Sequence, residues 1–276
     1  MFLGCILVFL PSTLTSSSKM GNMKEQTVSG KAKKKVGLIG CGAIGTVLAE
    51  AIERKLVVCD ELMVYDIDDS KAQKLKGALK FPVTIARSVD ELLAEKPKVV
   101  VEAASQQAAR DFVAKIASSG TEVIVMSTGA LLGLDFDLGR VHIPSGAIGG
   151  LDALSSASLA GIDEITLTSR KNPKALSKDN KVEAIVYEGY AEEAAKLFPR
   201  EMNVAATLAL TVKPVRVKVR VISDPSVKKN THEIQVKWRF GEMFLRFAND
   251  PHPDNPHTSA LAAWSAIKLL QNLLET

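Results

Sequence analysis

The stretch VGLIGCGAIGTVLAE, from Val36 to Glu50, joins a strand pattern to a helix pattern through three glycines. Gly40, Gly42 and Gly45 have the spacing G-x-G-x-x-G, after an apolar run and before residues with helical spacing. This arrangement is typical of the first strand, turn and helix of a dinucleotide-binding fold. Gly40 would allow the tight turn, Gly42 would let a pyrophosphate approach the backbone, and Gly45 would let the helix pack closely on the strand.

An acidic residue after the second expected strand completes this pattern. A carboxylate at Asp66 can accept both hydroxyls of a ribose and would repel a 2′-phosphate, so the sequence favours NAD and leaves NADP possible. Ala43 and Ile44 open the helix, whose free N–H groups and positive dipole end would face the phosphates. Asp68 and Asp69 are more simply explained as a solvated helix cap. The alternative for the glycine motif is a tight turn that binds nothing.

Strand and helix patterns alternate along residues 35–138, and the strand runs are apolar throughout. Such strands are buried on both faces, so we expect an α/β fold with a Rossmann-type, doubly wound parallel sheet. The pattern changes near residue 139. Val215–Val221 alternates valines with basic residues, and strand patterns follow at 232–240 and 242–249. Residues 139–249 are therefore predicted to form a second, α+β catalytic domain with an open antiparallel sheet that has one wet face.

The composition excludes several classes of protein. The chain has 276 residues and a formal net charge of +4, part of it in the KAKKK run before the first strand, so no nucleic-acid partner is expected. Three scattered cysteines make neither a disulfide framework nor a zinc site, which favours a reducing, cytoplasmic compartment and no bound metal. Cys41 is expected to be a small buried residue.

Residues 1–34 begin with a short apolar run and then become rich in serine and threonine. The apolar run resembles part of a signal peptide, but it has no basic start and is too short to span a membrane. A misplaced start codon explains it equally well. We therefore expect a disordered or mis-assigned extension, and no membrane partner.

The four histidines are candidates for proton transfer. His142 lies on a short strand and is expected to be hydrogen-bonded and half-buried. His252 and His257 lie in a proline-rich loop and are expected to be solvated. His232 lies on the same face of its expected strand as a row of apolar residues, at the end of that apolar face. By parity alone, a structural histidine is the more common explanation.

Several longer segments occur in a characteristic order: GCGAIG, EAASQQAARDF, VHIPSGAIGGLDAL, TLTSRKNPKAL, NVAATLALT, DPSVKKNTHEIQV and DNPHTSALAAWSAI. Together they resemble the L-aspartate dehydrogenase family over residues 35–275. Enzymes of this family oxidise L-aspartate to iminosuccinate with NAD or NADP, and the imine hydrolyses to oxaloacetate and ammonia. The resemblance implies this activity, and with it a supply of iminosuccinate for NAD biosynthesis.

The resemblance also implies roles for individual residues. The family's catalytic histidine matches His232 in NTHEI, and its cofactor-contacting alanine and asparagine match Ala108 in ASQQA and Asn203 in NVAATL. A C-terminal helix within residues 250–276 would return to the dinucleotide-binding domain, and the chain would form a homodimer or higher homo-oligomer. From the residues themselves, that helix is expected to start with Asn255 as its N-cap, followed by a proline.

The implied substrate carries one amine and two carboxylates, and the sequence offers groups for each. His232, as a histidine that titrates near neutrality, can exchange a proton with the amine. Backbone N–H groups at Ser145 and Gly146, in the glycine-rich turn before a helix, can bind a carboxylate. Arg170 and Lys171 are candidate counter-charges, and a solvated strand end explains them equally well.

Two other classes of protein would share this fold. A two-domain reductase similar to dihydrodipicolinate reductase is one, but the sequence has no motif of the KK-P type after the nucleotide-binding part. A non-catalytic NAD-binding sensor is the other, and His232 and Asn203 argue against it. Formation of NADH on addition of L-aspartate would separate the three.

Overall fold

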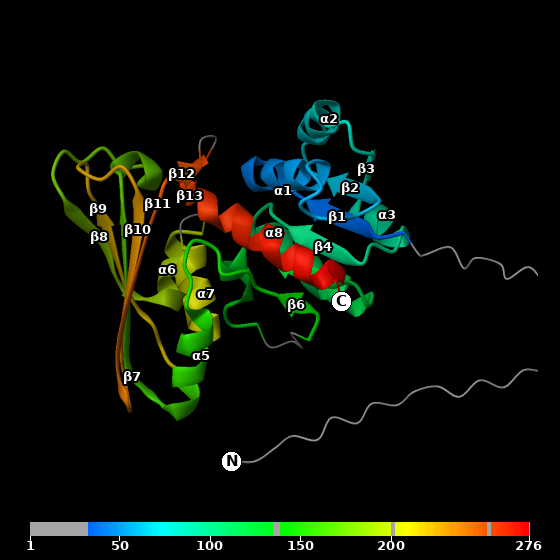
Figure 1. The fold of residues 1–276 in the computed structure, drawn as a ribbon. Coiled ribbons are helices and arrows are strands. Elements are labelled where there is room, and N and C mark those ends of the chain that lie inside the picture. The colour runs from blue at the N-terminus through cyan, green and yellow to red at the C-terminus, as the bar shows by residue number, and fades with distance from the viewer. Residues whose placement is uncertain (1–32, 135–138, 200–201, 253–254, 276) are drawn as a thin grey trace, which may run out of the picture. The chain divides into compact units, whose positions relative to one another are not determined.

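The computed structural model describes residues 33–134, 139–199, 202–252 and 255–275 (Figure 1). Most of the extension expected at residues 1–34 therefore lies outside the described residues. Lys34, however, belongs to the folded body, because its N–H donates to Asp60 Oδ2 at 2.7 Å and its Nζ donates to the carbonyl of Leu274 at 2.7 Å. The predicted boundary is wrong at this residue, since contacts distant in the sequence hold it.

Among the described residues, six parallel strands form the first sheet, in the order β3-β2-β1-β4-β5-β6. Their bounds are β1 Lys35–Ile39, β2 Glu61–Tyr65, β3 Val83–Ile85, β4 Val99–Glu102, β5 Glu122–Val125 and β6 Val141–His142. The chain adds strands on one side of β1 up to β3, then crosses to β4 and adds strands on the other side up to β6. The carboxyl ends of β1 and β4 are adjacent, at the switch point where such folds bind ligands. The predicted Rossmann-type sheet is confirmed.

Helices cover both faces of the first sheet, because its strands are apolar on both sides. One apolar core includes α1 Ala43–Glu53, α2 Asp69–Ala78 and α8 Ala260–Glu275. The core on the other face includes α3 Val89–Ala94, α4 Gln106–Ser118 and the 3-10 helix η1 Thr128–Leu131. The predicted cap at Asp68 is confirmed, since its side chain accepts from the N–H of Ser70 at the start of α2.

The sixth strand corrects the predicted start of the second domain. β6 pairs in parallel with β5, so residues 141–142 belong to the first sheet. The sequence pattern had assigned residues 139–249 to the second domain. A strand of two residues is too short to show a period, so only its pairing reveals it.

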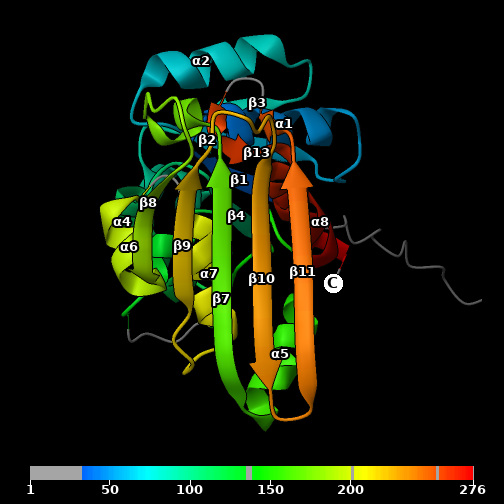
Figure 2. The same ribbon diagram turned by 90° about the vertical axis from the view of Figure 1, so that its left-hand side faces the viewer.

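The second sheet has the order β11-β10-β7-β9-β8 (Figure 2). Its strands are β7 Ile162–Lys171, β8 Ala184–Tyr190, β9 Lys218–Ser223, β10 Asn230–Trp238 and β11 Gly241–Asn249. β7 and β9 pair in parallel and the other neighbours pair antiparallel, so the sheet is mixed, not antiparallel as predicted. β8 was not predicted, because this edge strand has no fully buried residue and shows no clear alternation.

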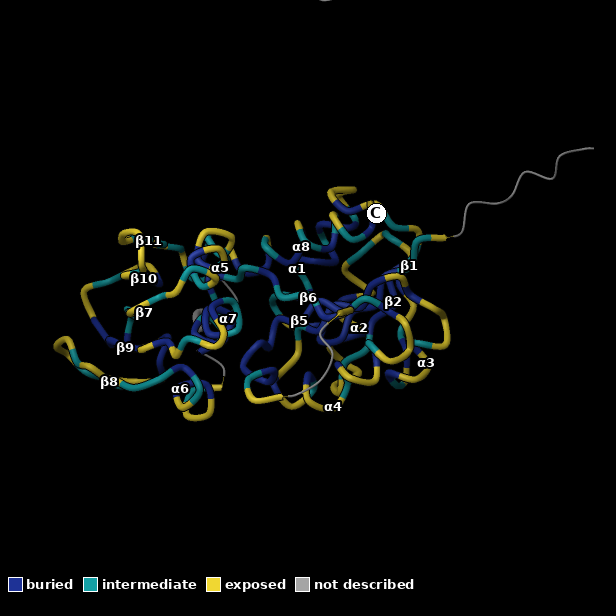
Figure 3. The backbone as a smooth tube through the Cα atoms, turned by 90° about the horizontal axis from the view of Figure 1, so that it is seen from below, coloured by how far each residue is buried: buried dark blue, intermediate teal, exposed yellow. Residues whose placement is uncertain are grey.

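Three helices cover one face of the second sheet, on the side toward the first sheet (Figures 1 and 3). They are α5 Leu151–Ala160, α6 Ala191–Leu197 and α7 Asn203–Thr211, and the short η2 Pro173–Leu176 follows β7. Val219 and Val221 are buried in this core, whereas Lys218 and Arg220 lie on the open face in ion pairs. The predicted single wet face is therefore confirmed.

The segment before α8 differs from its prediction. Asn255 does not cap a helix, because residues Asn255–Ser259 form β13, which pairs with β12 (Pro251–His252), and α8 begins only at Ala260. His252 is buried, not solvated, while the side chain of His257 lies outside the described part of the structure. No described helix is long and apolar enough to cross a membrane.

Candidate active site

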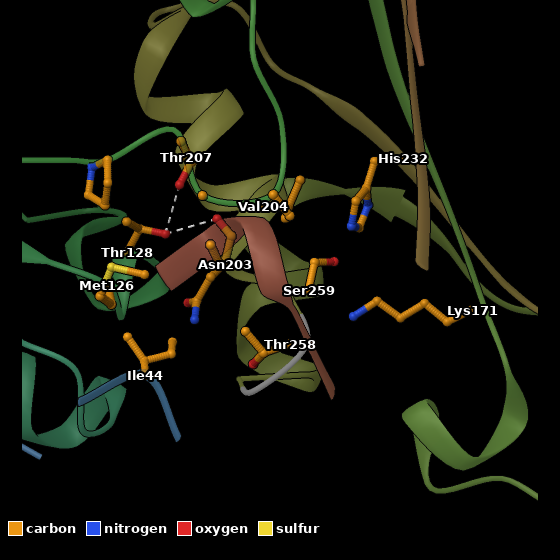
Figure 4. A pocket seen from close by; sticks show the side chains of 14 residues that line it. Ile44, Met126, Thr128, Lys171, Asn203, Val204, Thr207, His232, Thr258 and Ser259 are labelled. Carbon is orange, nitrogen blue, oxygen red and sulfur yellow. Dashed lines mark hydrogen bonds between the residues drawn. The ribbon is translucent and has the colours of Figure 1, made fainter. Parts of the chain in front are cut away.

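A pocket lies between the carboxyl ends of the first sheet and the helix-covered side of the second (Figure 4). The side chain of Lys171 extends toward it from β7 and the ring of His232 from β10, while Asn203 approaches from the start of α7. Its lining comprises Ile44, Met126, Thr128, Pro144, Gly146, Ala147, Lys171, Asn203, Val204, Thr207, His232, Thr258, Ser259 and Ala262. The pocket thus joins the glycine turn of the first sheet to the candidate catalytic histidine.

The three glycines of the turn each meet a different steric requirement. Gly40 has φ +97°, and a Cβ there would lie 2.7 Å from the carbonyl oxygen of Ala103. A Cβ on Gly45 would lie 2.1 Å from the carbonyl oxygen of Gly40, so α1 packs too closely for any side chain. No described atom lies within 4 Å of a Cβ placed on Gly42. Space for a phosphate is therefore open at Gly42, as the motif predicts.

The start of α1 has polar groups suited to a dinucleotide. Gly42, its N-cap, supplies no side-chain acceptor, so Ala43 and Ile44 begin the helix at a free positive end. The carboxylate of Asp66 lies at the same turn, because its Oδ2 accepts from the N–H of Cys41 at 2.7 Å. Cys41 is buried as predicted, and this burial raises the pKa of its thiol to about 12.

A buried carboxylate joins the ends of two strands. It was not predicted from the sequence. Glu102, the last residue of β4, accepts from the N–H groups of Ala104 and Ser105, and from both the N–H and the hydroxyl of Ser127. Burial raises the pKa of this carboxyl group, against the effect of those donors. Glu102 therefore fixes the loops after β4 and β5. The β4 loop leads into α4, where the half-buried Ala108 lies in the first turn.

Asn203 is held in one orientation at the edge of the pocket. Its Oδ1 accepts from the N–H of Gly129 at 3.2 Å, a role that only the oxygen of the amide can take. Its backbone carbonyl accepts from the hydroxyl of Thr128 at 2.8 Å, and that hydroxyl also lies 3.1 Å from the hydroxyl of Thr207. The NH2 group of Asn203 is thus the part of the amide directed to a ligand.

His232 is buried where β7 and β10 pair. Its Nδ1 lies 2.9 Å from the hydroxyl of Ser169, the residue directly opposite on β7. Burial, together with the nearby charge of Lys171, lowers the pKa of His232 to about 3. The expectation that this histidine titrates near neutrality is therefore wrong for the protein without substrate, because removal from water disfavours the cation.

The two candidate counter-charges on β7 point to opposite faces of the sheet. Lys171 is buried and lines the pocket, two residues along from Ser169 on the same face. Arg170 faces the other way and forms ion pairs with Glu183 and Asp224. The candidate role of Arg170 as a pocket counter-charge is therefore wrong, because strand alternation separates two neighbours that the sequence reading treated as equals.

The glycine-rich turn before α5 contributes less than expected. Gly146 lines the pocket, but its N–H already donates to the hydroxyl of Ser265 at 3.0 Å. Ser145 is not among the described residues that line the pocket, and its carbonyl accepts from Ile148. The helix itself begins only at residue 151, after Gly150 in the left-handed conformation. The N–H of Gly146 is therefore already used within the protein, and carboxylate binding by the N–H of Ser145 stays a prediction.

The sequence alone did not identify several polar residues of the pocket. Thr258 and Ser259 line it from β13, in a segment that was expected to open a helix. Thr128 and Thr207 line it near Asn203. Ser169 could have been found, because it shares strand parity with Lys171 in TSRK. The others lie on segments whose contacts are set by the fold alone.

The remaining histidine prediction is confirmed. His142 is half-buried and its Nε2 lies 2.6 Å from Glu122 Oε2, so it has a structural partner. Within the described residues, no group of three or more His, Cys, Asp or Glu side chains is arranged to hold a metal ion.

Two family profiles match consecutive parts of the chain. The profile described as "Homoserine dehydrogenase, NAD binding domain" matches residues 40–140, and that described as "Aspartate dehydrogenase, C-terminal" matches residues 152–273. The first covers the glycine turn and the end of β4, and the second covers the pocket residues of β7, β10 and α7.

Curated relatives match nearly their whole length. An L-aspartate dehydrogenase of Archaeoglobus fulgidus is 44% identical over 250 residues, which is 87% of this chain and 98% of the relative. One of Methanosarcina barkeri is 39% identical over 263 residues, which is 87% of this chain and 97% of the relative. The crystal structure of aspartate dehydrogenase from Thermotoga maritima has a TM-score of 0.69 at 30% identity, covering 87% of this chain and 96% of that one.

Proposed function

The chain belongs to the L-aspartate dehydrogenase family, and from this we propose that it catalyses the NAD(P)-dependent oxidation of L-aspartate to iminosuccinate. The observation that carries the proposal is the single pocket region shared by Ile44 of the glycine turn, Asn203 of α7 and His232 of β10. A nucleotide bound along the glycine turn would end beside the amide of Asn203. The substrate would then lie between that end and His232.

The residues of the first sheet fit a dinucleotide. The open space at Gly42 suits the pyrophosphate, and the free N–H groups at the start of α1 suit its charge. The Asp66 carboxylate uses one lone pair of each oxygen for the N–H groups of Cys41 and Asp68, which leaves further lone pairs for ribose hydroxyls. Its negative charge favours NAD over NADP. When bound, the nicotinamide supplies the acceptor for the hydride that leaves Cα of the substrate.

The nicotinamide carboxamide would be held by Asn203. Since Oδ1 of Asn203 is bonded to Gly129, its NH2 group would donate to the carboxamide oxygen. Ala108 would flank the nucleotide from the first turn of α4, near the carboxyl end of β4. Both roles extend the family resemblance to these positions.

His232 would move the protons of the reaction. L-aspartate arrives with an ammonium group, and one proton must leave it before its nitrogen lone pair can form the C=N bond as the Cα–H bond breaks. Nε2 of His232 would accept that proton and pass it to solvent. The same nitrogen would then take a proton from the water that adds to the imine carbon, and return it to the amine nitrogen of the resulting carbinolamine. The C–N bond breaks, ammonia leaves, and the hydroxyl loses its proton to solvent as the C=O bond of oxaloacetate forms.

The substrate carboxylates would be bound by Lys171 and by hydroxyl groups. Lys171 is the lysine among the described pocket residues, and its ammonium group can neutralise one carboxylate. Thr258 and Ser259 can donate to the other from β13. Two carboxylates next to Lys171 would also raise the proton affinity of His232 once substrate is bound, from the low value that it has without substrate.

The direct test is an absorbance assay for NADH with a panel of substrates. L-aspartate should be oxidised, and four relatives should be poor substrates. D-aspartate has the opposite chirality, L-asparagine lacks one carboxylate, L-glutamate has a longer side chain, and L-malate lacks the amine. NADH binding without turnover on any of them would favour the sensor. NADPH-dependent reduction of a cyclic imine dicarboxylate without aspartate oxidation would favour the reductase class.

Three further expectations belong to this proposal. The product imine would be available to NAD biosynthesis, which a coupled assay with the enzyme that consumes iminosuccinate would test. The chain would form a homodimer or higher oligomer, which light scattering would measure. Its three scattered cysteines support a reducing, cytoplasmic compartment, which fractionation of cells would test.

A further inference from the structure

His232 and Ser169 face each other across two neighbouring strands of the second sheet. The register of β7 and β10 pairs them directly, and each side chain is 1% exposed. The hydroxyl oxygen of Ser169 lies 2.9 Å from Nδ1 of His232. Because Nδ1 is engaged within the sheet, Nε2 is the ring nitrogen left for a ligand in the pocket.

We propose that Ser169 is a positioning residue for His232, and that its hydroxyl holds Nδ1 so that Nε2 meets the substrate amine. The inference rests on the proposed function, since it concerns how the acid–base group is held. Ser169 is not among the described residues that line the pocket, so it acts through the imidazole ring.

A hydroxyl suits both protonation states of the ring. When Nδ1 carries the proton of the neutral ring, the Ser169 oxygen accepts its hydrogen bond, and the lone pair of Nε2 is free. After Nε2 has taken the proton from the substrate ammonium group, both ring nitrogens carry N–H groups. The same oxygen still accepts from Nδ1. The ring can therefore gain and lose its proton without breaking the contact that orients it.

A serine also adds no charge beside the ring. A carboxylate in that position would stabilise the imidazolium and raise its pKa. Here none of the described residues lining the pocket is Asp or Glu, and Lys171 is the charged group that acts on His232. The negative charge that favours a proton on the ring thus comes with the two carboxylates of the substrate. Ser169 orients the base and stabilises its protonated form only through a neutral hydrogen bond, so the larger change in the proton affinity of His232 is left to substrate binding.

The test compares Ser169→Thr, which keeps the hydroxyl, with Ser169→Val, which has nearly the same shape without it. Both are β-branched residues that strands accommodate well, so their difference reports the hydroxyl. We expect kcat for L-aspartate to be about tenfold or more lower in S169V than in S169T, as part of the 10²–10⁴-fold effect typical of a positioned acid–base group. The Kd for NADH, measured by fluorescence, should be the same in both.

The pH profile gives a readout that a purely structural role would not change. The acid limb of kcat reports the base in the substrate complex. Without an acceptor for its Nδ1–H, the imidazolium is less stable, so the limb should lie at lower pH in S169V than in S169T. In a His232→Asn background the two Ser169 variants should have equal kcat, because the effect passes through the ring.

The outcomes separate this inference from the proposed function. If S169V and S169T agree in kcat and in the pH limb while H232N loses turnover, Ser169 does not position the histidine and the proposed function stands. If H232N oxidises aspartate at the wild-type rate, the proposed catalytic role of His232 fails instead. Should S169V not fold, Ser169→Ala compared with wild type carries the same expectations, with a melting curve as the control.

Discussion

At the scale of single residues, the pocket directs particular atoms toward a ligand by engaging their neighbours. Gly129 holds the oxygen of the Asn203 amide, and Ser169 holds Nδ1 of His232. Each contact decides which remaining atom faces the pocket: the NH2 group of Asn203 and Nε2 of His232. Because these side chains are already ordered, substrate binding has a smaller entropic cost to offset.

Lys171 and Arg170 offer a matched test of substrate recognition. Lys171→Met removes the cation that lies in the pocket, so kcat/KM for L-aspartate should fall by about 30-fold or more, since breaking a buried charge pair costs at least about 2 kcal/mol. Arg170→Met breaks the ion pairs with Glu183 and Asp224 on the opposite face. It should lower the melting temperature and leave KM for aspartate nearly unchanged. Steady-state kinetics with equal aspartate KM for both variants would exclude Lys171 from recognition.

Asp66 tests the cofactor preference. Asp66→Ser removes the charge that would accept the ribose hydroxyls and repel a 2′-phosphate, so KM for NAD should rise and the ratio of kcat/KM for NADP to that for NAD should increase. Asp68→Ser is the control, because Asp68 caps α2 through Ser70 in a solvated position. An unchanged cofactor ratio in D66S would mean that this carboxylate does not face the ribose.

The pKa of His232 predicts how stability depends on acid. It lies at about 3 in the folded protein against an ordinary value of 6.5. Between these two values the unfolded chain binds a proton that the folded chain excludes, so stability rises with pH across this window and is lost as pH falls through it. The contribution has a slope of up to about 1.4 kcal/mol per pH unit. Urea unfolding of His232→Asn at several pH values should show a flatter dependence than the wild type. An identical slope would contradict the low pKa.

At the scale of elements, the carboxyl ends of β4 and β5 are joined by Glu102. Its four bonds fix the loop that starts α4 and the loop that leads to η1. Residues Thr128 and Gly129 of η1 in turn bond to Asn203 at the start of α7. A buried charge in the first sheet is thus connected through hydrogen bonds to a pocket residue on a helix of the second.

Glu102→Gln should disturb this connection. A glutamine would place its NH2 group against an N–H or O–H donor that Glu102 now accepts from. A buried donor left without an acceptor lowers the free energy of unfolding by about 1–3 kcal/mol. KM for NAD should rise as well, because the loop that supports Asn203 shifts. Glu95→Gln is the control, since Glu95 pairs with Lys35 at the surface and such pairs contribute about 1 kcal/mol or less. Equal denaturation curves and equal KM for both variants would argue against this role.

At the scale of the whole described molecule, α8 links the end of the chain to both the core and the pocket. Its residues Ala266, Leu270 and Leu274 are buried in the core that contains β1. At its start, Ala262 lines the pocket, and Ser265 accepts from the N–H of Gly146. The last helix therefore completes the fold of the first sheet and one wall of the pocket together.

The contribution of α8 to stability should come mainly from its buried apolar side chains. Leu270→Ala removes a side chain that is 1% exposed, which should lower the free energy of unfolding by about 2–5 kcal/mol. Leu261→Ala makes the same chemical change at a residue that is 37% exposed, and should cost much less. Denaturant titrations measure both. Similar losses in the two variants would mean that α8 does not pack with Leu270 inward.

The sequence by itself determined the features that depend on local pattern. The glycine spacing, the apolar strands and the alternation in Val215–Val221 specified a Rossmann-type sheet and a second sheet with one wet face, because side-chain periodicity follows directly from backbone geometry. The cap at Asp68 was visible for the same reason. The family resemblance named His232 and Asn203 as candidates.

Tertiary structure decided what depends on pairing between distant segments. The second sheet is mixed because β7 pairs in parallel with β9, which lies far away in the chain. β13 formed where a helix start was expected, because it pairs with the neighbouring β12. The face on which Lys171 enters the pocket, the bond of Ser169 to His232 and the low pKa of that histidine all follow from burial and register. A sequence specifies which groups are present, but only packing determines their neighbours and their distance from water, and these set their chemistry.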